Sequence, residues 1–522
     1  MRQAAKVDRR FFLKQATAAF LSASALGNSP GIAQTLVPKR GGYAKFGIGD
    51  GSTTNTLDPR GHAETFTICA FDGGLSNSLM EVDARGEVVG DLAESWDATK
   101  DIKTWKFVLH PDLSFHNGKK VTAADVMDSL RFHSGPDSVS AMKSALSAIS
   151  AMKPDGDRGI VFELSEPSAD FPYLLSDYHL AVMPSLGDGK VDWESGVRTG
   201  PFILEDFQPG ISTKLRRNPN YHKDGKPYFE NVEFFCIVDA AARNNALLTG
   251  EIDYCDPVDL KVFERIKSTP GIMVNEVSGY SHFSLPMDVT AMPFNDPNVR
   301  LALKHAINRE EIVEKILLGH AKIGNDNPIS SGMKFATDPS PQHTYDPEKA
   351  RSYLKRSGLE ELSVDLHVAE AAFAGAVNAA TLIKEQAKAA GIRINIVREP
   401  DDAYWDNVWL KKPWCFSNWS GRPTCDWMFT TAYAKDAAWN ETHWSNPRFN
   451  ALLAQGRGEL DDKKRSEIYA EMQQLVHDDG GAIIFAFNNY VTANSSKLMH
   501  GEIAANHPGD GTKIAERWWM AE

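Results

Sequence analysis

The sequence predicts an α/β protein of more than one lobe, because helix and strand patterns alternate in its second half and the chain is long. Two such units are helix 378–390 followed by strand 392–397, and helix 460–477 followed by strand 482–487. Glycine separates helix from strand in both units, which is a common way for a helix to end. A chain of 522 residues exceeds what one hydrophobic core usually serves, so we expect at least two lobes.

Further strands and helices are predicted from local sequence patterns. Residues 42–48 and 105–109 are predicted strands, the second because apolar and polar residues alternate in it. Polar N-capping residues ahead of an apolar face predict further helices, which begin after Thr122, Asp296, Asn308 and Asp346. Helices and strands together favour layers of helix against sheet.

The N-terminus has the pattern of an export signal. Arg9 and Arg10 precede an apolar stretch rich in Ala and Ser, which is shorter than the roughly 20 apolar residues that cross a bilayer. Small residues at Gly31 and Ala33 predict cleavage after Ala33, so residues 1–33 are a predicted twin-arginine signal peptide. The predicted location is therefore the periplasm. The alternative is a basic amphipathic first helix of the fold.

Composition limits the classes of partner. The net charge is −13, and no basic block stands out in the sequence. Nucleic acid is bound by clustered Lys and Arg, so we expect no nucleic-acid partner. No apolar run after the N-terminus is long enough for a membrane span, so we expect a soluble mature protein.

The cysteines leave two alternatives open. They are Cys69, Cys236, Cys255, Cys415 and Cys425, and none belongs to a CxxC motif, which makes a zinc cluster unlikely on spacing alone. An oxidising compartment would allow Cys236 to pair with Cys255, or Cys415 with Cys425. Buried free thiols are the other interpretation.

Motifs of catalysis are absent from the sequence. It contains no GxSxG, no HExxH and no GxxxxGK[ST] pattern. We therefore predict a protein that is not an enzyme and that has no cofactor.

An ordered set of short segments resembles one family along nearly the whole mature chain. These segments are 55–59, 79–83, 90–96, 105–109, 115–126, 198–202, 217–221, 248–253, 299–307 and 345–350. Each is weak by itself, but their order is specific. Together they resemble the solute-binding proteins of ABC importers in the dipeptide, oligopeptide and nickel group, which is solute-binding protein family 5.

The resemblance implies a two-lobed periplasmic-binding-protein fold of class II type with an extra small domain. It places the main domain of the first lobe at 34–60, 176–282 and 486–522, and the small domain at 61–175. The second lobe is then 283–485. Two strands near 280–285 and 484–489 would cross between the lobes and act as the hinge. The closed form would be presented to the membrane subunits of an ABC permease, and we expect a monomer.

The same resemblance suggests where a ligand is held. Peptide-binding members carry a carboxylate three residues after a tryptophan, and it holds the amino terminus of the peptide. Here Trp419 matches the tryptophan, but Arg422 stands in place of the acid. The planar guanidinium suits a carboxylate or phosphate group. Asp426 could still take an amine, or it could pair with Arg422.

The first predicted crossing departs from the family pattern in the same direction. Peptide binders often have Tyr-x-Glu before a Phe, whereas this chain has Tyr280, Ser281 and His282 before Phe283. Histidine in place of the acid removes a negative charge from the pocket. The alternative is that His282 has only a packing role. Both departures favour a ligand with an anionic group, such as an opine, an acidic peptide conjugate or a sugar phosphate.

Aromatic residues concentrate between 404 and 444, where large side chains with one polar atom suit a pocket that encloses a ligand. The remaining predicted ligand residues, besides Tyr280, are Thr54, Asn55, Trp439, Asn440, Trp444, Phe485 and Asn488. A second hypothesis is a metal- or haem-binding member of the same group, for which His282 and His443 are the candidate ligands. A third is a cofactor enzyme exported by the twin-arginine route, which no motif supports.

Overall fold

The structure is a computed structural model. It describes residues 38–521 except 63, 136, 137, 141, 402, 403, 436 and 438. The predicted signal peptide at 1–33 lies outside the described residues.

A mixed sheet runs through the molecule in the order β10-β11-β12-β1-β13-β19-β14-β18, and β15 also pairs with β19. Its strands are β1 (Tyr43–Ile48), β10 (Phe202–Gln208), β11 (Ser212–Arg217), β12 (Asn231–Cys236), β13 (Tyr254–Asp256), β14 (Ile272–Pro286), β15 (Ala321–Ile323), β18 (Ser417–Trp419) and β19 (Ala482–Ser495). β1 is parallel to β12 and β13, and β14 is antiparallel to β19.

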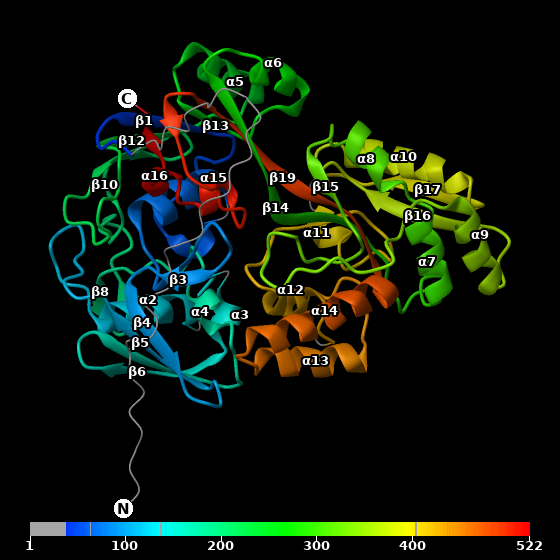
Figure 1. Cartoon of the computed structure of the whole chain (residues 1–522), viewed down its shortest axis with the longest axis horizontal. Helices are drawn as coiled ribbons and strands as arrows, with labels where there is room; N and C mark the ends of the chain where they lie inside the picture. The colour runs from blue at the N-terminus through cyan, green and yellow to red at the C-terminus, as the bar shows by residue number, and fades with distance from the viewer. Residues whose placement is uncertain are drawn as a thin grey trace, which may run out of the picture. The chain divides into compact units, whose positions relative to one another are not determined.

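The two longest strands, β14 and β19, join two parts of this sheet (Figure 1). The first half of β14 pairs with the last part of β19, beside β13, whereas its second half pairs with the start of β19, beside β18. The register is interrupted between Ser278 and His282. Elements on the β13 side are called the first lobe below, and elements on the β18 side the second lobe.

The first lobe has a main module, which holds β1 and β10–β13, and a small module. The small module is an antiparallel sheet of order β4-β5-β7-β6 covered by α2, and its core contains Phe107, Phe162 and Phe171. Its elements are β2 (Met80–Val82), β3 (Val88–Gly90), β4 (Ala93–Ala98), β5 (Thr104–Leu109), α2 (Ala123–Ser134), α3 (Lys143–Leu146), β6 (Ile149–Asp155), β7 (Gly159–Leu164) and α4 (Phe171–Leu174).

The main module is completed by short helices and strands, including the C-terminal segment. They are η1 (Pro59–Gly61), α1 (Thr65–Thr67), η2 (Ile68–Leu75), α5 (Ala240–Thr249), η3 (Leu260–Val262), α6 (Phe263–Lys267), β20 (Leu498–Met499), α15 (Pro508–Gly511), α16 (Ile514–Arg517) and β21 (Trp519–Met520). The short strands β8 (Ser185–Gly187) and β9 (Lys190–Val191) instead pack against α2 of the small module. Phe46, Phe234 and Tyr254 belong to its core.

The second lobe contains most of the long helices. They are α7 (Pro297–His305), α8 (Arg309–Lys315), α9 (Pro347–Arg356), α10 (Ala376–Lys388), α11 (Tyr404–Asn407), α12 (Cys425–Ala432), α13 (Pro447–Arg457) and α14 (Asp462–Asp479). The strands β16 (Leu362–Val368) and β17 (Ile392–Arg398) are parallel and α10 connects them. This is the helix–strand alternation that the sequence predicts, and it gives the lobe its α/β layers.

The predicted capping residues begin the helices that they precede. The side chains of Asp296, Asn308 and Asp346 accept hydrogen bonds from backbone N–H groups of the first turns of α7, α8 and α9. Helix α14 begins two residues later than predicted, because Asp461 is its cap and accepts from Lys464 N at 3.0 Å. Leu460 therefore lies before the helix. β19 continues well past residue 487, because it crosses into the main module.

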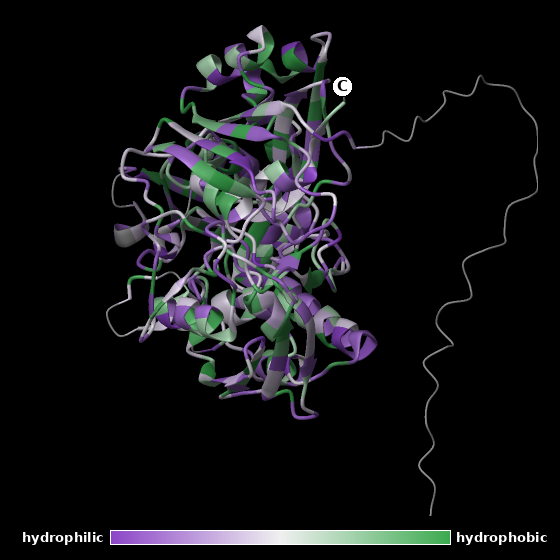
Figure 2. Cartoon of the chain, turned by 90° about the vertical axis from the view of Figure 1, so that its left-hand side faces the viewer, coloured by the Kyte–Doolittle hydropathy of each residue, from purple (hydrophilic) through white to green (hydrophobic). Residues whose placement is uncertain are grey.

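Hydrophilic and hydrophobic residues alternate along many strands and helices (Figure 2). Burial follows this alternation in β16, where buried and exposed residues alternate from Leu362 to Leu366. All five cysteines lie among the described residues and are free thiols, so the structure forms neither candidate disulfide. In the described part of the chain, the helices are too short or too polar to cross a membrane.

Candidate functional site

Arg422 lies in the short loop between β18 and α12. One nitrogen of its guanidinium, Nη1, donates to Ser420 O at 3.0 Å and to Gly421 O at 3.2 Å. The guanidinium also lies 5.7 Å from the centre of the Trp419 ring. No carboxylate among the described residues forms a salt bridge with it. A guanidinium has five donors, so most of those on Arg422 have no protein acceptor.

Asp426 does not pair with Arg422, although the sequence left that alternative open. It lies in the first turn of α12 and accepts from Arg457 Nε of α13 at 3.3 Å. Burial raises the pKa of Asp426 to about 6, against the lowering effect of Arg457. The helix turns this carboxylate toward its neighbour helix, away from the loop that holds Arg422.

Residues of the first lobe lie near the Arg422 charge. Burial lowers the pKa of Arg422, while Asp177 and Tyr178 act to raise it. Asp177 already has a partner, since its Oδ1 lies 2.6 Å from His179 Nδ1. Burial would raise the pKa of Asp177, but His179 holds it below its ordinary value. The acid near Arg422 is thus already hydrogen-bonded to its own neighbour His179, and Arg422 has no carboxylate partner.

His282 lies on β14 between the two strands that flank it, in register with Trp419 on one side and Phe487 on the other. It is 1% exposed, and its Nδ1 has no hydrogen-bond partner among the described residues. Burial and the Arg422 charge lower the pKa of His282 to about 3. His282 is therefore neutral at pH 7 and adds no negative charge to the site.

Tyr280 supports this arrangement from the same strand. Its hydroxyl donates to Gly332 O at 2.8 Å. A Cβ atom on Gly421 would lie 2.1 Å from Tyr280 Cβ, so a side chain cannot be accommodated there without a shift. Glycine at 421 lets the Arg422 loop lie directly against β14.

Three histidines of the first lobe, His62, His179 and His507, contact Tyr178 or Asp177, the two residues that act on the Arg422 charge. His62 Nδ1 lies 3.0 Å from Asp72 Oδ2, and its Nε2 lies 3.0 Å from Thr56 O. Both partners are acceptors, so both ring nitrogens donate and His62 is held as a cation. Burial, His179 and Arg422 together lower the pKa of His507 to about 4, against the raising effect of Asp177, so His507 is neutral at pH 7. His62 and His179 each have a carboxylate partner, Asp72 and Asp177. Among these groups, Arg422 is the charge without a carboxylate partner.

Sequence reasoning missed Asp177, Tyr178, His179 and His507. They come from two segments that are more than 300 residues apart, and neither segment carries a motif. Only the three-dimensional arrangement brings them near Arg422.

Three predicted ligand residues are already engaged inside the second lobe. Phe485 is 0% exposed and belongs to the hydrophobic core of that lobe. Trp444 is buried and its Nε1 donates to Asp479 Oδ2 at 2.8 Å. Asn440 Nδ2 donates to Trp444 O at 2.8 Å. These contacts favour packing roles for the three side chains.

The other predicted residues differ in exposure and location. Thr54 is exposed, and Asn55 is buried, where its side chain bonds Ser52 N and Glu64. Asn488 lies on β19 in register with Ala321 of β15. Trp439 is 46% exposed and its ring contacts Trp419.

The two lobes contact each other beside this site. Arg465 of α14 pairs with Asp170 of the small module, and both side chains are almost fully buried. Lys334 lies 3.0 Å from Glu87, and Ala169 N donates to Arg457 O at 2.9 Å. Trp427 of α12 packs against the small-module core. The two lobes are therefore in direct contact through α12, α13 and α14 on one side and the small module on the other.

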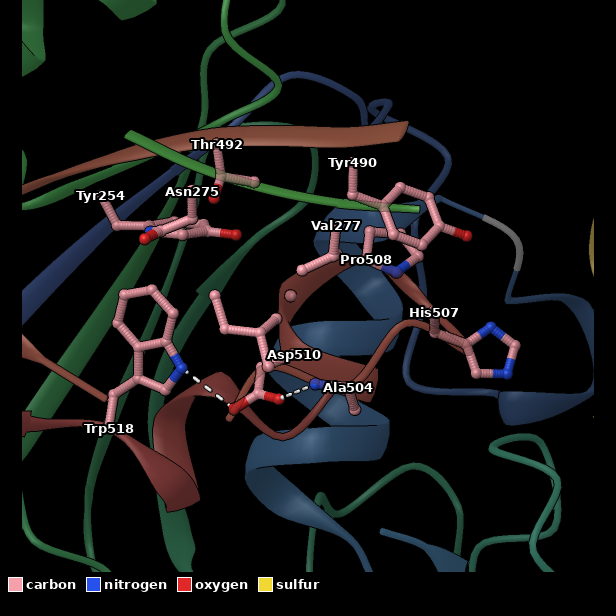
Figure 3. Close-up of a pocket in the computed structure, with 12 residues that line it drawn as sticks. Tyr254, Asn275, Val277, Tyr490, Thr492, Ala504, His507, Pro508, Asp510 and Trp518 are labelled. Atoms are coloured by element: carbon pink, nitrogen blue, oxygen red, sulfur yellow. Dashed lines mark hydrogen bonds between the residues drawn. The ribbon is translucent and has the colours of Figure 1, made fainter. Parts of the chain in front are cut away.

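A small cavity lies in the main module between the sheet and the C-terminal segment (Figure 3). None of the twelve predicted ligand residues lines it. Asp510 on its wall accepts from Ala504 N at 2.7 Å and from Trp518 Nε1 at 3.0 Å. His507 lines it too, and so connects it with the surroundings of Arg422.

The candidate metal ligands do not come together. His282 is buried in the sheet, whereas His443 is exposed and lies 3.3 Å from Asp288. Within the described ranges, no three or more His, Cys, Asp or Glu residues form a group that could hold a metal ion.

A family model described as bacterial extracellular solute-binding proteins, family 5, matches residues 87–441, which is more than half of the chain. The chain belongs to this family. It is similar to a glutathione-binding protein of Pectobacterium atrosepticum, with 25% identity over 86% of this chain and 90% of the relative. It is also similar to the dipeptide-binding protein of Escherichia coli, with 28% identity over 79% of this chain and 83% of the relative.

The fold agrees with solved structures. The binding protein AgaA of an Agrobacterium tumefaciens strain, solved with agropinic acid, superposes with a TM-score of 0.74 at 21% identity, over 92% of this chain and 99% of AgaA. This confirms the two-lobed periplasmic-binding-protein fold. The chain is thus the solute-binding component of an ABC importer.

Proposed function

We propose that this protein captures a small solute with an anionic group between its two lobes and delivers it to an ABC permease, and that Arg422 binds the anionic group. The single observation that carries the proposal is the Arg422 guanidinium, which faces the other lobe without a carboxylate partner. A carboxylate or phosphate would fill its free donors with paired hydrogen bonds.

The surroundings of Arg422 favour an anion over an amine. Asp177 is hydrogen-bonded to His179, and Asp426 to Arg457, so neither acid pairs with Arg422. An ammonium group would therefore meet a net positive charge there. An uncompensated charge in a poorly solvated site costs several kcal/mol, and an incoming anion removes that cost.

The relatives allow such a ligand. One is named for glutathione, a peptide with two carboxylates, and one structural neighbour was solved with agropinic acid. Another is named for dipeptides, each of which carries one carboxylate. We infer a carboxylate-bearing solute, such as an opine or an acidic peptide conjugate, as the class to test first.

We further propose that β14 and β19 are the hinge. Lobe 1 would comprise 34–60, 176–282 and 486–522 with the small domain 61–175, and lobe 2 would comprise 283–485. The register interruption between Ser278 and His282 falls within β14 where it passes between the lobes, which supports bending there. Closure would then depend on contacts that a ligand makes with both lobes.

The remaining parts of the proposal concern cellular location, oligomeric state and enzymatic activity. We propose export to the periplasm by the twin-arginine route, on the sequence of residues 1–33, and a monomer without enzymatic activity. Edman sequencing of the protein from a periplasmic fraction would begin at Gln34 if cleavage follows Ala33. Retention of Met1 there would refute the signal.

Mass spectrometry of ligand released from the purified native protein, followed by calorimetry with that ligand, tests the proposal. We expect an anion. The Arg422→Ala variant should bind it about 30-fold or more weakly, because the partner charge is then left unpaired. Arg422→Lys should recover part of the affinity, since it restores the charge but not the fork.

The matched control is Arg393→Ala, which removes an exposed arginine of the same lobe. Its affinity should equal that of the wild type. A released ligand without an anionic group, or equal affinities for the wild type and Arg422→Ala, would refute the proposed role.

A further inference from the structure

Three indole rings form a closed group next to Arg422. The ring centres of Trp409 and Trp419 are 6.1 Å apart, those of Trp409 and Trp439 are 5.9 Å apart, and those of Trp419 and Trp439 are 6.0 Å apart. All three pairs meet edge to face, which is a favoured geometry for aromatic rings. Trp405 extends the group, with its ring 6.2 Å from that of Trp409.

The group is buried at one end and open at the other. Trp419 is 4% exposed, whereas Trp439 is 46% exposed and Trp405 is 38% exposed. Trp439 thus keeps nearly half of a large apolar side chain uncovered, although it is held against two other rings. Large aromatic side chains with uncovered faces are typical of surfaces that bind ligands.

A buried carboxylate fixes two of these rings. Glu441 accepts from Trp409 Nε1 through Oε2 and from Trp419 Nε1 through Oε1, the latter at 2.9 Å. Ser417 Oγ also donates to Oε2 at 2.9 Å. Burial raises the pKa of Glu441, while these donors lower it. Among the described residues, none with a positive charge forms a salt bridge with Glu441.

This arrangement is costly for packing alone. Burying a carboxylate without a counter-ion costs several kcal/mol, and an apolar side chain would fill the same space more cheaply. What Glu441 provides, and an apolar side chain does not, is a fixed orientation for Trp409 and Trp419. The two indole rings therefore keep fixed orientations before a ligand arrives.

The aromatic group is continuous with the proposed anion site. Trp419 contacts both Trp439 and the Arg422 guanidinium, at 6.0 Å and 5.7 Å. The Arg422 guanidinium and the partly exposed Trp439 ring therefore both contact one buried ring.

Resting on the function proposed above, we propose that Trp409, Trp419 and Trp439 form an aromatic subsite, oriented by Glu441, for a ring with an apolar face. The solute class is then an anion that carries an aromatic or sugar ring, rather than a bare inorganic anion or an aliphatic acid. Trp439 contacts the ring, and Glu441 is a positioning residue that acts through Trp409 and Trp419.

Calorimetry with three probes of equal charge tests this inference. N-acetylglycine carries only the carboxylate, whereas N-benzoylglycine adds an aromatic ring and glucuronate presents a sugar ring. At least one ring-bearing probe should bind the wild type about tenfold more tightly than N-acetylglycine. The probe that binds more tightly shows whether the subsite prefers an aromatic ring or a sugar ring.

Two variants assign the ring preference to the subsite. Trp439→Ala should abolish it, so that the ring-bearing probe and N-acetylglycine bind this variant equally. Glu441→Gln should reduce the ratio of the two affinities at least threefold, whereas a general loss of folding would lower both affinities alike. Trp519→Ala, which removes a partly exposed indole of the main module, is the matched control and should keep the preference.

Equal binding of all three probes, no binding of any of them, or a ring preference that survives Trp439→Ala would overturn the inference. Arg422→Ala separates this result from the proposed function. If it leaves the binding of N-acetylglycine unchanged while Trp439→Ala still removes the ring preference, the anion site fails and the aromatic subsite stands.

Discussion

Two arginines of the second lobe, Arg309 and Arg422, have opposite surroundings. Arg309 is 2% exposed, and its Nη2 lies 2.8 Å from both oxygens of Asp326. Its Nη1 donates to Lys304 O at 3.0 Å and to His343 O at 2.7 Å. Arg422, by contrast, has only two nearby carbonyls of its own loop.

The difference separates a charge that holds the fold from one that, on the proposed function, binds the ligand. Asp326 also accepts from His343 Nδ1 at 2.8 Å and from Ile484 N at 3.0 Å, so it joins four segments of the lobe. A buried ion pair of this kind is strongly destabilising to break. Arg422 does not connect distant segments of the lobe in this way. Its removal should therefore affect ligand binding and not folding.

The largest expected effect is that of Asp326→Asn. It removes the charge and leaves Arg309 buried without a counter-ion, so the free energy of unfolding should fall by about 3–5 kcal/mol. Guanidinium denaturation followed by circular dichroism measures this. Asp365→Asn, at an exposed position of β16, is the control and should change stability by less than about 0.5 kcal/mol. A loss no larger than that of the control would remove Asp326 from this role.

Low pH should weaken the stabilisation that the Asp326–Arg309 pair provides. Burial alone would raise the pKa of Asp326, but the Arg309 charge and the His343 hydrogen bond hold it well below its ordinary value. The stabilisation is therefore complete above the ordinary carboxyl pKa of about 3.9 and is lost as the pH falls toward the folded-state pKa.

Denaturation curves at pH 5, 4 and 3 check this for the wild type and Asp326→Asn. The difference in stability between the two proteins should shrink toward pH 3, with a limiting slope of about 1.4 kcal/mol per pH unit for one proton. A difference that stays constant over this range would contradict the assigned direction.

A smaller effect is expected at the contact between the lobes. Asp170→Asn leaves Arg465 buried without its partner in the closed form, which should disfavour closure by about 1–3 kcal/mol. Calorimetry should show the corresponding loss of ligand affinity, and small-angle scattering a more open average form. The double variant Asp170→Asn with Arg465→Met should recover part of the loss. Unchanged affinity in the single variant would show that this pair does not bias closure.

The smallest effect on stability is expected for Arg422→Met. The variant replaces an unpaired guanidinium with an apolar side chain, so the free energy of unfolding should stay within about 0.5 kcal/mol of the wild type or increase. The same denaturation assay without ligand measures it. A loss as large as that of Asp326→Asn would erase the distinction between the two arginines.

The sequence supplied the elements of the fold more readily than the site. Helices α7, α8 and α9 begin at capping residues whose signals are local, and the glycine breaks before β17 and β19 are local too. The full length of β19 could not be predicted, because its second half depends on pairing with β14 far along the chain.

The candidate site shows the same difference between features with a local sequence signal and features that depend on the folded chain. Trp419, Arg422 and His282 were predicted by comparison with a family pattern, and the structure places them together at β18 and β14. Phe485 and Trp444 look identical to pocket residues in a sequence, since burial in a core and contact with a ligand both select large apolar side chains. Glu441 carried no signal, because only the folded chain brings both indoles to it.

The position of His282 has a mechanical consequence. This residue is in register with Trp419 on one side and with Phe487 of the second crossing strand on the other. If β14 and β19 are the hinge, as proposed, their rotation displaces His282 together with its neighbour Trp419 while the lobes separate. A substitution that stiffens these strands should then change how long the solute stays bound as well as how far the lobes open.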